Sequence, residues 1–124
     1  MVEIEIDNRS GVEVDETAVR GLAEQVLTGE GVDSGELGIA FVGPDEMRAL
    51  KAEHLGIDEA TDVLSFPIDG REHLPSGLQR QLGDAVVCPQ VTGDAWRRSL
   101  VHGLLHLLGY GHGAEMEKRE ERYE

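Results

Sequence analysis

The sequence predicts an α+β fold: a single domain spanning residues 1–124, in which a small, mixed, four-stranded sheet is packed with helices. Three observations lead to this prediction. The length of 124 residues is typical of one domain. Segments with strand and helix patterns are interspersed along the chain. The loop between the third and fourth strands has the length of a hairpin connection, so at least one pair of strands is expected to be antiparallel.

Strand and helix patterns alternate in the first half of the chain. The opening segment VEIEI alternates apolar and acidic residues, which is typical of a half-buried strand. After Asp15, apolar residues recur at spacings of three and four, so they share one helix face. Pro44 favours a helix start, and the acidic residues after it lie near the positive end of the helix dipole. The expected elements are a strand over 2–6, a helix from 15 or 16 to 29, a strand over 37–42 and a helix from 43 to about 56.

The second half combines two strands with a helix near the C-terminus. Pro67 and Pro89 limit the strands, because proline donates no hydrogen bond to a sheet. Gly109 suits the left-handed end of a helix. The expected elements are strands over 62–66 and 83–87, a loop from 69 to about 81 between them, a helix over 96–108 and a charged tail over 114–124. The tail is expected to be a solvated helix or a frayed end.

Composition narrows the environment in which the protein works. The formal net charge is −14, so the chain lacks the broad basic surface that usually supplies non-specific affinity for nucleic acid or anionic membranes. No apolar run reaches the roughly 18 residues of a membrane span, and the acidic N-terminus is not a targeting peptide. Cys88 is the only cysteine, which fits a reducing compartment. We therefore expect a cytoplasmic protein without a membrane partner.

Three of the five histidines fall within eleven residues and predict a metal site. His102 and His106 are four residues apart, so their rings leave the same face of the expected helix one turn apart. Gly109 lets the chain turn, which can bring His112 to the same point. Three protein ligands leave one position of a tetrahedral ion open to water, as in catalytic zinc sites. We expect one Zn²⁺ per chain, and imidazole also suits nickel, copper and iron.

The spacing of these histidines equals that of the metzincin proteases, but one essential residue of those enzymes is missing. Their motif H-E-x-x-H-x-x-G-x-x-H contains a glutamate that acts as general base, whereas Gly103 occupies that position here. This difference argues against peptide hydrolysis. A zinc-activated water can attack a phosphodiester, an amide or an ester, and the motif alone does not choose among them. The missing side chain at position 103 leaves room for a bulky substrate or a neighbouring strand.

Three segments of the chain match the pattern of a known family. VHGLLHLLGYGH resembles the signature H-G-x-L-H-L-x-G-Y-D-H, TDVLSFP resembles T-D/N-V-L-S-F-P, and LGD with CP resembles L-G-D-I-x-I-C-P. These are motifs of the YbeY family of metal-dependent endoribonucleases, also called rRNA maturation factors, and the resemblance covers nearly the whole chain. It implies a small mixed sheet with helices, cleavage of single-stranded RNA, and roles in small-subunit rRNA maturation and ribosome quality control.

The resemblance also assigns roles to individual residues. It makes His102, His106 and His112 the zinc ligands. It places Asp84 near the cleft, where this carboxylate would orient a ligand or a water as a catalytic residue; otherwise Asp84 is a turn residue at a strand end. Ser65 is expected to line the strand that faces the metal-binding helix, and the simplest interpretation is a hydroxyl on an edge strand with no chemical role.

Few basic side chains are available to hold RNA: Arg48 and Lys51 on the second expected helix, Arg71 and Arg80 around the loop, and Arg97 and Arg98 before the histidines. Arg97 and Arg98 lie about one turn before His102, so we expect them to flank the metal and bind substrate. Because the net charge repels polyphosphate, we expect ribosomal RNA to be presented by a partner, either the small ribosomal subunit or a ribosomal protein.

The chain departs from the family pattern at three places. Gly111 stands where the family has an aspartate before its last histidine. Leu55 stands six residues before Thr61, where many relatives carry an arginine that is a candidate phosphate contact. The segment 90–100 is short for the family.

Two other functions fit the same residues. In one, the domain is a ribosome-assembly binding module and the zinc ion is mainly structural. In the other, the protein is a zinc hydrolase of a small substrate. A fourth protein ligand would favour the structural role, and a deep, narrow pocket would favour the small substrate. An open zinc position in a cleft would favour the leading hypothesis, a zinc-dependent endoribonuclease that uses a metal-activated water.

Overall fold

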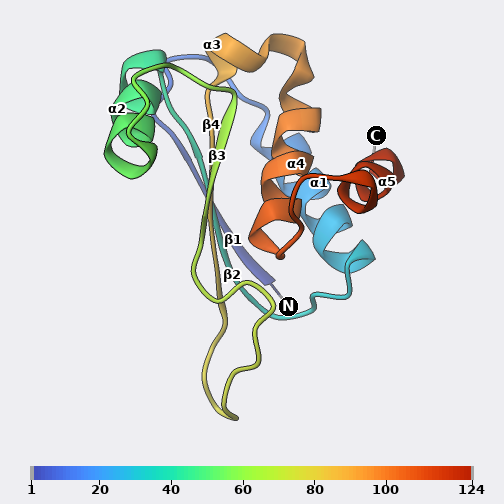
Figure 1. Ribbon diagram of the computed structural model, residues 1–124. Coiled ribbons are helices and arrows are strands. Elements are labelled where there is room, and N and C mark those ends of the chain that lie inside the picture. Colours follow the sequence, from blue (N-terminus) through green and yellow to red (C-terminus); the bar gives the residue numbers. More distant parts are fainter. Residues whose placement is uncertain (1, 124) are drawn as a thin grey trace.

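A four-stranded sheet organises the molecule, and helices pack against both of its faces (Figure 1). The computed structural model describes residues 2–123. The strands are β1 (Val2–Asn8), β2 (Gly35–Phe41), β3 (Val63–Pro67) and β4 (Gln81–Val87). The helical elements are α1 (Glu16–Gly29), α2 (Pro44–Leu55), α3 (Pro89–Thr92), the 3₁₀ turn η1 (Gly93–Ala95), α4 (Trp96–Leu107) and α5 (Ala114–Arg122). The expected α+β class is confirmed, and the three histidines lie on and just after a helix near the C-terminus, as expected.

The sheet is mixed, and its order places β3 at one edge. The strand order is β1-β2-β4-β3. The pairs β1–β2 and β2–β4 are parallel, whereas β3 and β4 form the expected antiparallel hairpin. In this hairpin Val63 lies opposite Val87, and Pro67 lies opposite Gly83. Because β3 is an edge strand, one of its sides is left free to border a site.

The two faces of the sheet are covered by different helices. Helices α1 and α4 pack on one face, and α2 lies on the other (Figure 1). On β4, Ala85 belongs to the core beneath α1 and α4, whereas Val86 packs with Met47 of α2. Successive residues of a strand point to opposite faces, so adjacent residues along β3 or along β4 pack into different cores. The side of the sheet that a residue faces therefore decides whether it can reach the histidines.

The helix boundaries follow the signals in the sequence. The Asp15 side chain accepts a hydrogen bond from the backbone N–H of Ala18 at 3.0 Å and so caps α1. Pro44 begins α2, which ends at Gly56 with a φ of 72°, a left-handed conformation that glycine adopts without steric cost. Within residues 2–123, no helix has the length and apolar character needed to cross a membrane.

The charged tail is a docked helix rather than a frayed end. In α5, Met116 is 1% exposed, and Tyr123 just after it is 6% exposed. The hydroxyl of Tyr123 donates a hydrogen bond to Glu30 at the end of α1. Helix α5 also packs against α4, so the tail lies beside the histidines of the expected metal site.

Candidate metal centre

His102, His106 and His112 meet beside the C-terminal half of α4. One ring nitrogen from each histidine lies within 4.8 Å of those from the other two. The ring centroids of His102 and His106 are 4.5 Å apart, and those of His106 and His112 are 4.6 Å apart. The structure therefore brings together the three residues that the sequence identifies as zinc ligands.

The turn after α4 returns the third histidine to the first two. Gly109 has a φ of 100°, a conformation that a residue with a side chain rarely adopts. Its backbone N–H donates to the carbonyl oxygen of His106 at 3.0 Å, and the N–H of Tyr110 donates to the carbonyl oxygen of Leu105 at 3.1 Å. This is the turn at Gly109 that the spacing of the histidines requires.

Hydrogen bonds to the far sides of two rings fix their tautomers. The Nδ1 atom of His106 lies 2.9 Å from the backbone carbonyl oxygen of Tyr110, and Nδ1 of His102 lies 3.1 Å from Oε1 of Glu120. A carbonyl and an ionised carboxylate only accept hydrogen bonds, so both Nδ1 atoms must carry the proton. In the neutral rings the Nε2 atoms then carry lone pairs, and these two atoms are 3.0 Å apart. Two lone pairs at this distance repel each other unless a cation or a proton lies between them.

The charge state of His106 also suits a metal ligand. Burial lowers the pKa of His106, and the neighbouring histidines lower it further, whereas the hydrogen bond to the Tyr110 carbonyl opposes the change. The net effect is a pKa below the ordinary value, so His106 is neutral around pH 7. Only a neutral imidazole has the free lone pair that a metal ion needs. The donor set and its protonation therefore fit Zn²⁺, which forms bonds of about 2.0–2.1 Å to imidazole nitrogen.

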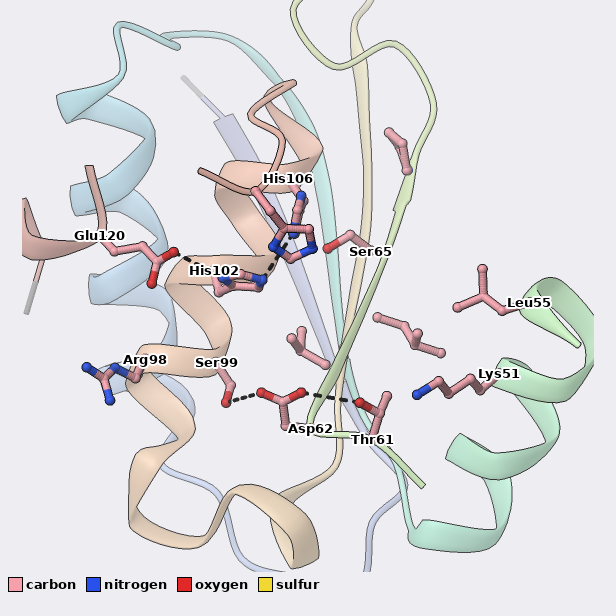
Figure 2. Close-up of a pocket in the computed structure, with 14 residues that line it drawn as sticks. Lys51, Leu55, Thr61, Asp62, Ser65, Arg98, Ser99, His102, His106 and Glu120 are labelled. Carbon is pink, nitrogen blue, oxygen red and sulfur yellow. Dashed lines mark hydrogen bonds and ion pairs between the residues drawn. The ribbon is translucent and has the colours of Figure 1, made fainter. Parts of the chain in front are cut away.

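A cavity of about 640 Å³ opens over the histidines. It runs along the edge strand β3, with Lys51 and Leu55 of α2 on one side and α4 and α5 on the other (Figure 2). On the α4 side, the Ser99 hydroxyl donates to the Asp62 carboxylate at 2.9 Å. The site is thus part of a cleft between two helices, with an edge strand as its floor.

Comparison with known proteins identifies the family. Residues 4–123 match the family described as Endoribonuclease YbeY. The chain belongs to the YbeY endoribonuclease family. The YbeY endoribonuclease of Salinispora tropica is 38% identical over 94% of this chain and 87% of its own length, and that of Acidothermus cellulolyticus is 40% identical over 94% and 83%. The solution structure of a Thermotoga maritima protein superposes with a TM-score of 0.60 at 25% identity and covers 97% of this chain and 85% of that one.

Two residues of the YbeY-family motifs lie where the sequence analysis placed them. Ser65 faces α4, lines the cavity and donates a hydrogen bond from its hydroxyl to the carbonyl of Gly103 at 2.8 Å. Gly103 itself is a point of close approach between α4 and the sheet, because a Cβ atom there would lie 2.8 Å from Cγ2 of Val63. Position 103 therefore makes room for a neighbouring strand, which was one of the two expected reasons for its glycine.

Asp84 lies on the wrong face of the sheet to meet the histidines, so its expected place near the cleft is wrong. The neighbouring Ala85 points toward α4, and strand alternation turns Asp84 to the opposite face, beside Gly38 of β2. There Asp84 borders a separate hollow with Glu3 and Glu36. It is not a turn residue either, because it lies in the middle of β4. The structure gives no support to a catalytic role for Asp84.

The two arginines expected to bind substrate are placed differently. Arg98 lines the rim of the histidine cavity, and Figure 2 shows its guanidinium turned away from the rings. Arg97 does not border that cavity; its guanidinium lies 4.8 Å from the centre of the Trp96 ring. Of the two arginines, Arg98 alone borders the cavity that holds the histidines.

Three further residues border the site: Lys51, Asp62 and Glu120. Lys51 is among the basic side chains that the sequence offers for RNA, and it lies four residues before Leu55, so both share one face of α2. Asp62 and Glu120 were not predicted, although a signal existed for Glu120. Glu120 lies four residues after Met116, whose apolar side chain marks the buried face of α5. For Asp62 the sequence offers no signal beyond its place in the TDVLSFP segment.

Proposed function

We propose that this protein is a zinc-dependent endoribonuclease that cleaves single-stranded RNA with a metal-activated water. The observation that carries the proposal is the pair of Nε2 atoms of His102 and His106, 3.0 Å apart, both left as lone-pair donors by the hydrogen bonds on their Nδ1 atoms. Membership of the YbeY family supports RNA as the substrate.

The chain's own residues hold and orient the reacting groups. Zinc, when bound, activates a water molecule and neutralises charge that develops on the attacked phosphate. His102, His106 and His112 would hold the ion, and the Tyr110 carbonyl keeps the proton of His106 on Nδ1, away from it. Gly103 provides no carboxylate of the kind that serves metzincin proteases as a base.

Lys51 is the basic residue best placed to contact RNA inside the cleft. Its side chain is 12% exposed, and its ammonium group forms an ion pair with Glu59 at 3.0 Å. Glu59 is 64% exposed, so a phosphate can compete with this carboxylate for the ammonium group. Leu55, which stands where many relatives carry an arginine, borders the same cavity one helical turn after Lys51. We infer that Lys51 provides the phosphate contact that Leu55 cannot.

The path of the RNA follows from the positions of these cations. Lys51 lies on the α2 side of the cleft and Arg98 on the rim formed by α4, with the edge strand β3 between them (Figure 2). A single strand laid along β3 would meet the zinc ion in the middle and one basic side chain on either side.

The expected partner remains the small ribosomal subunit, or one of its proteins, acting in the cytoplasm. With a net charge of −14, the protein repels free RNA except near the zinc ion and the few bases beside it. A ribosomal partner with a basic surface would provide the encounter through charge complementarity. The proposed task is therefore the maturation and quality control of small-subunit rRNA.

The arrangement of the site supports an enzyme over the two other functions. The metal-binding group found among residues 2–123 consists of the three histidines, and Glu120 is engaged with Nδ1 of His102 on the far side of the ring. Three protein ligands would leave a bound zinc ion one coordination position for water, which a structural zinc site lacks. The cavity extends from α2 to α5, which suits a polymer better than a small substrate.

An RNA-cleavage assay tests the proposal. The zinc-loaded protein is expected to cut a single-stranded rRNA fragment and to leave the matching duplex intact, whereas the metal-free protein and the His102→Ala, His106→Ala double variant leave both intact. Circular dichroism checks that the double variant is folded. Binding to small-subunit particles without cleavage of any RNA would establish the assembly module instead, and cleavage of a small ester but not of RNA would establish the small-substrate hydrolase.

A further inference from the structure

Helix α5 sends one carboxylate to the metal centre. Oε1 of Glu120 lies 3.1 Å from Nδ1 of His102, and Figure 2 shows this side chain pointing from α5 toward the ring. Glu120 is 20% exposed and His102 is 28% exposed, so the contact is largely shielded from solvent. It joins residues 18 positions apart, across the turn that carries His112.

The docking of α5 determines where Glu120 points. Met116, Glu120 and Tyr123 follow one another at spacings of four and three, so they lie on one face of α5. Met116 and Tyr123 are 1% and 6% exposed, and Arg119 lies 3.7 Å from the buried Glu30. Because both ends of this face are anchored, α5 cannot rotate and Glu120 is held against His102.

The two helical ligands obtain their orientation from different sources. His106 is fixed by the carbonyl of Tyr110, which belongs to the histidine motif itself. His102 depends on Glu120, which lies outside that motif. A carboxylate on the outer nitrogen of a metal-ligating histidine fixes both the tautomer and the ring orientation, and its loss typically weakens metal binding about 10–100-fold.

We infer that Glu120 is a positioning residue for the metal, and that α5 is consequently part of the metal site. It does not contact the ion; it holds the proton of His102 on Nδ1 so that Nε2 faces the ion. This inference rests on the zinc binding proposed above but not on the identity of the substrate.

The test measures zinc affinity at one fixed pH with a competing chelator. We expect Glu120→Ala to bind zinc about 10–100-fold more weakly than the parent protein. Glu120→Gln should lose less zinc affinity, because its amide oxygen still accepts the hydrogen bond from Nδ1 of His102. Glu121→Gln is the matched control: it makes the same change in charge at the next position of α5, where the side chain is exposed, and its affinity should be unchanged.

A second readout separates positioning from a general effect on folding. The visible spectrum of the cobalt-substituted protein reports the geometry of the ligands, and it should change in Glu120→Ala but be restored in Glu120→Gln. Circular dichroism of the metal-free variants checks that α5 stays folded. Zinc affinity in a folded Glu120→Ala equal to that of the parent would overturn the inference while leaving the proposed enzyme intact. If the parent protein binds no zinc, both proposals fall together.

Discussion

Gly103 of α4 and Val63 of β3 are so close that a methyl group at position 103 would lie 2.8 Å from Cγ2 of Val63. The same methyl group would lie 3.3 Å from the hydroxyl of Ser65. Glycine normally costs about 1 kcal/mol relative to alanine inside a helix. Here a Cβ atom would clash with the edge strand, so the close packing of α4 against β3 requires glycine at this position.

This contact predicts that Gly103→Ala destabilises the protein, although alanine favours helices. Overpacking typically costs about 1–3 kcal/mol, which exceeds the gain of about 1 kcal/mol from helix propensity. The free energy of unfolding in urea measures the net effect. Combining Gly103→Ala with Val63→Ala removes the clash, so the double variant should be less destabilised than the sum of its two single variants. Additive effects would contradict the prediction.

The buried Glu30 should contribute to stability as an ionised group. Its side chain is 1% exposed and accepts hydrogen bonds from the hydroxyls of Tyr123 and Tyr110, with Arg119 and Arg71 nearby. We expect Glu30→Gln to lower the free energy of unfolding at pH 7 by about 1–3 kcal/mol. Glu24→Gln, at an exposed position of α1, is the control and should change it by less than about 0.5 kcal/mol.

The contribution of Glu30 should depend on pH in a defined direction. Burial acts to raise the pKa of Glu30, but the hydrogen bonds from the two tyrosines and the nearby arginines outweigh it and hold the pKa below the ordinary 4.5. A pKa that is lower in the folded state stabilises the protein above the unfolded value, and this contribution is lost as pH falls through the folded value. The difference in stability between the parent and Glu30→Gln should therefore shrink below pH 4.5. A difference that stays constant or grows in acid would show the sign to be wrong.

Lys51 and Glu59 should affect RNA binding in opposite directions. Lys51→Gln removes a phosphate contact, so the affinity for single-stranded RNA falls. The slope of the logarithm of the binding constant against the logarithm of salt concentration also becomes shallower by about 0.7. Glu59→Gln removes the competing carboxylate, so affinity rises. Fluorescence anisotropy with metal-free protein measures both without cleavage. If Glu59→Gln weakens binding, the ion pair supports the cleft rather than competing with phosphate.

The two adjacent arginines provide a matched comparison. Arg98 lines the rim of the histidine cavity, whereas Arg97 lies against Trp96. Arg98→Gln should weaken RNA binding and reduce the salt slope, while Arg97→Gln, which makes the same change in charge one residue away, should have a smaller effect. Equal effects would mean that the overall charge, rather than contact at the rim, determines affinity.

Free RNA should bind weakly because of the acidic surface. At about 150 mM salt, we expect a dissociation constant for naked single-stranded rRNA above roughly the micromolar range, and tighter binding to small-subunit particles. A titration of each against the isolated protein makes the comparison. Nanomolar binding to naked RNA with no gain from the particle would rule out delivery by a ribosomal partner.

The sequence predicted the local elements and the clustering of the three histidines well, because both depend on short-range spacing. His102 and His106 must share a helix face at a separation of four residues, and Gly109 permits the turn that follows. The face of Asp84 was not predictable in this way. Strand β4 is buried on both faces around it, so the apolar run AVV has no alternation that shows which side faces the helix. The docking of α5 was not predicted, because charged residues dominate the tail and its buried apolar contacts come from Met116 and Tyr123.

The hydrogen bonds that Glu30 accepts from Tyr110 and Tyr123 have a consequence for metal loading. They attach the turn before His112 and the end of α5 to α1 through contacts that involve no ion. We therefore expect the three histidines and their supports to be assembled in advance, so that an arriving ion need not order the chain, a cost that would otherwise be subtracted from its affinity. Helix α5 of the metal-free protein should accordingly resist proteolysis, and the protein should take up zinc without a slow conformational step.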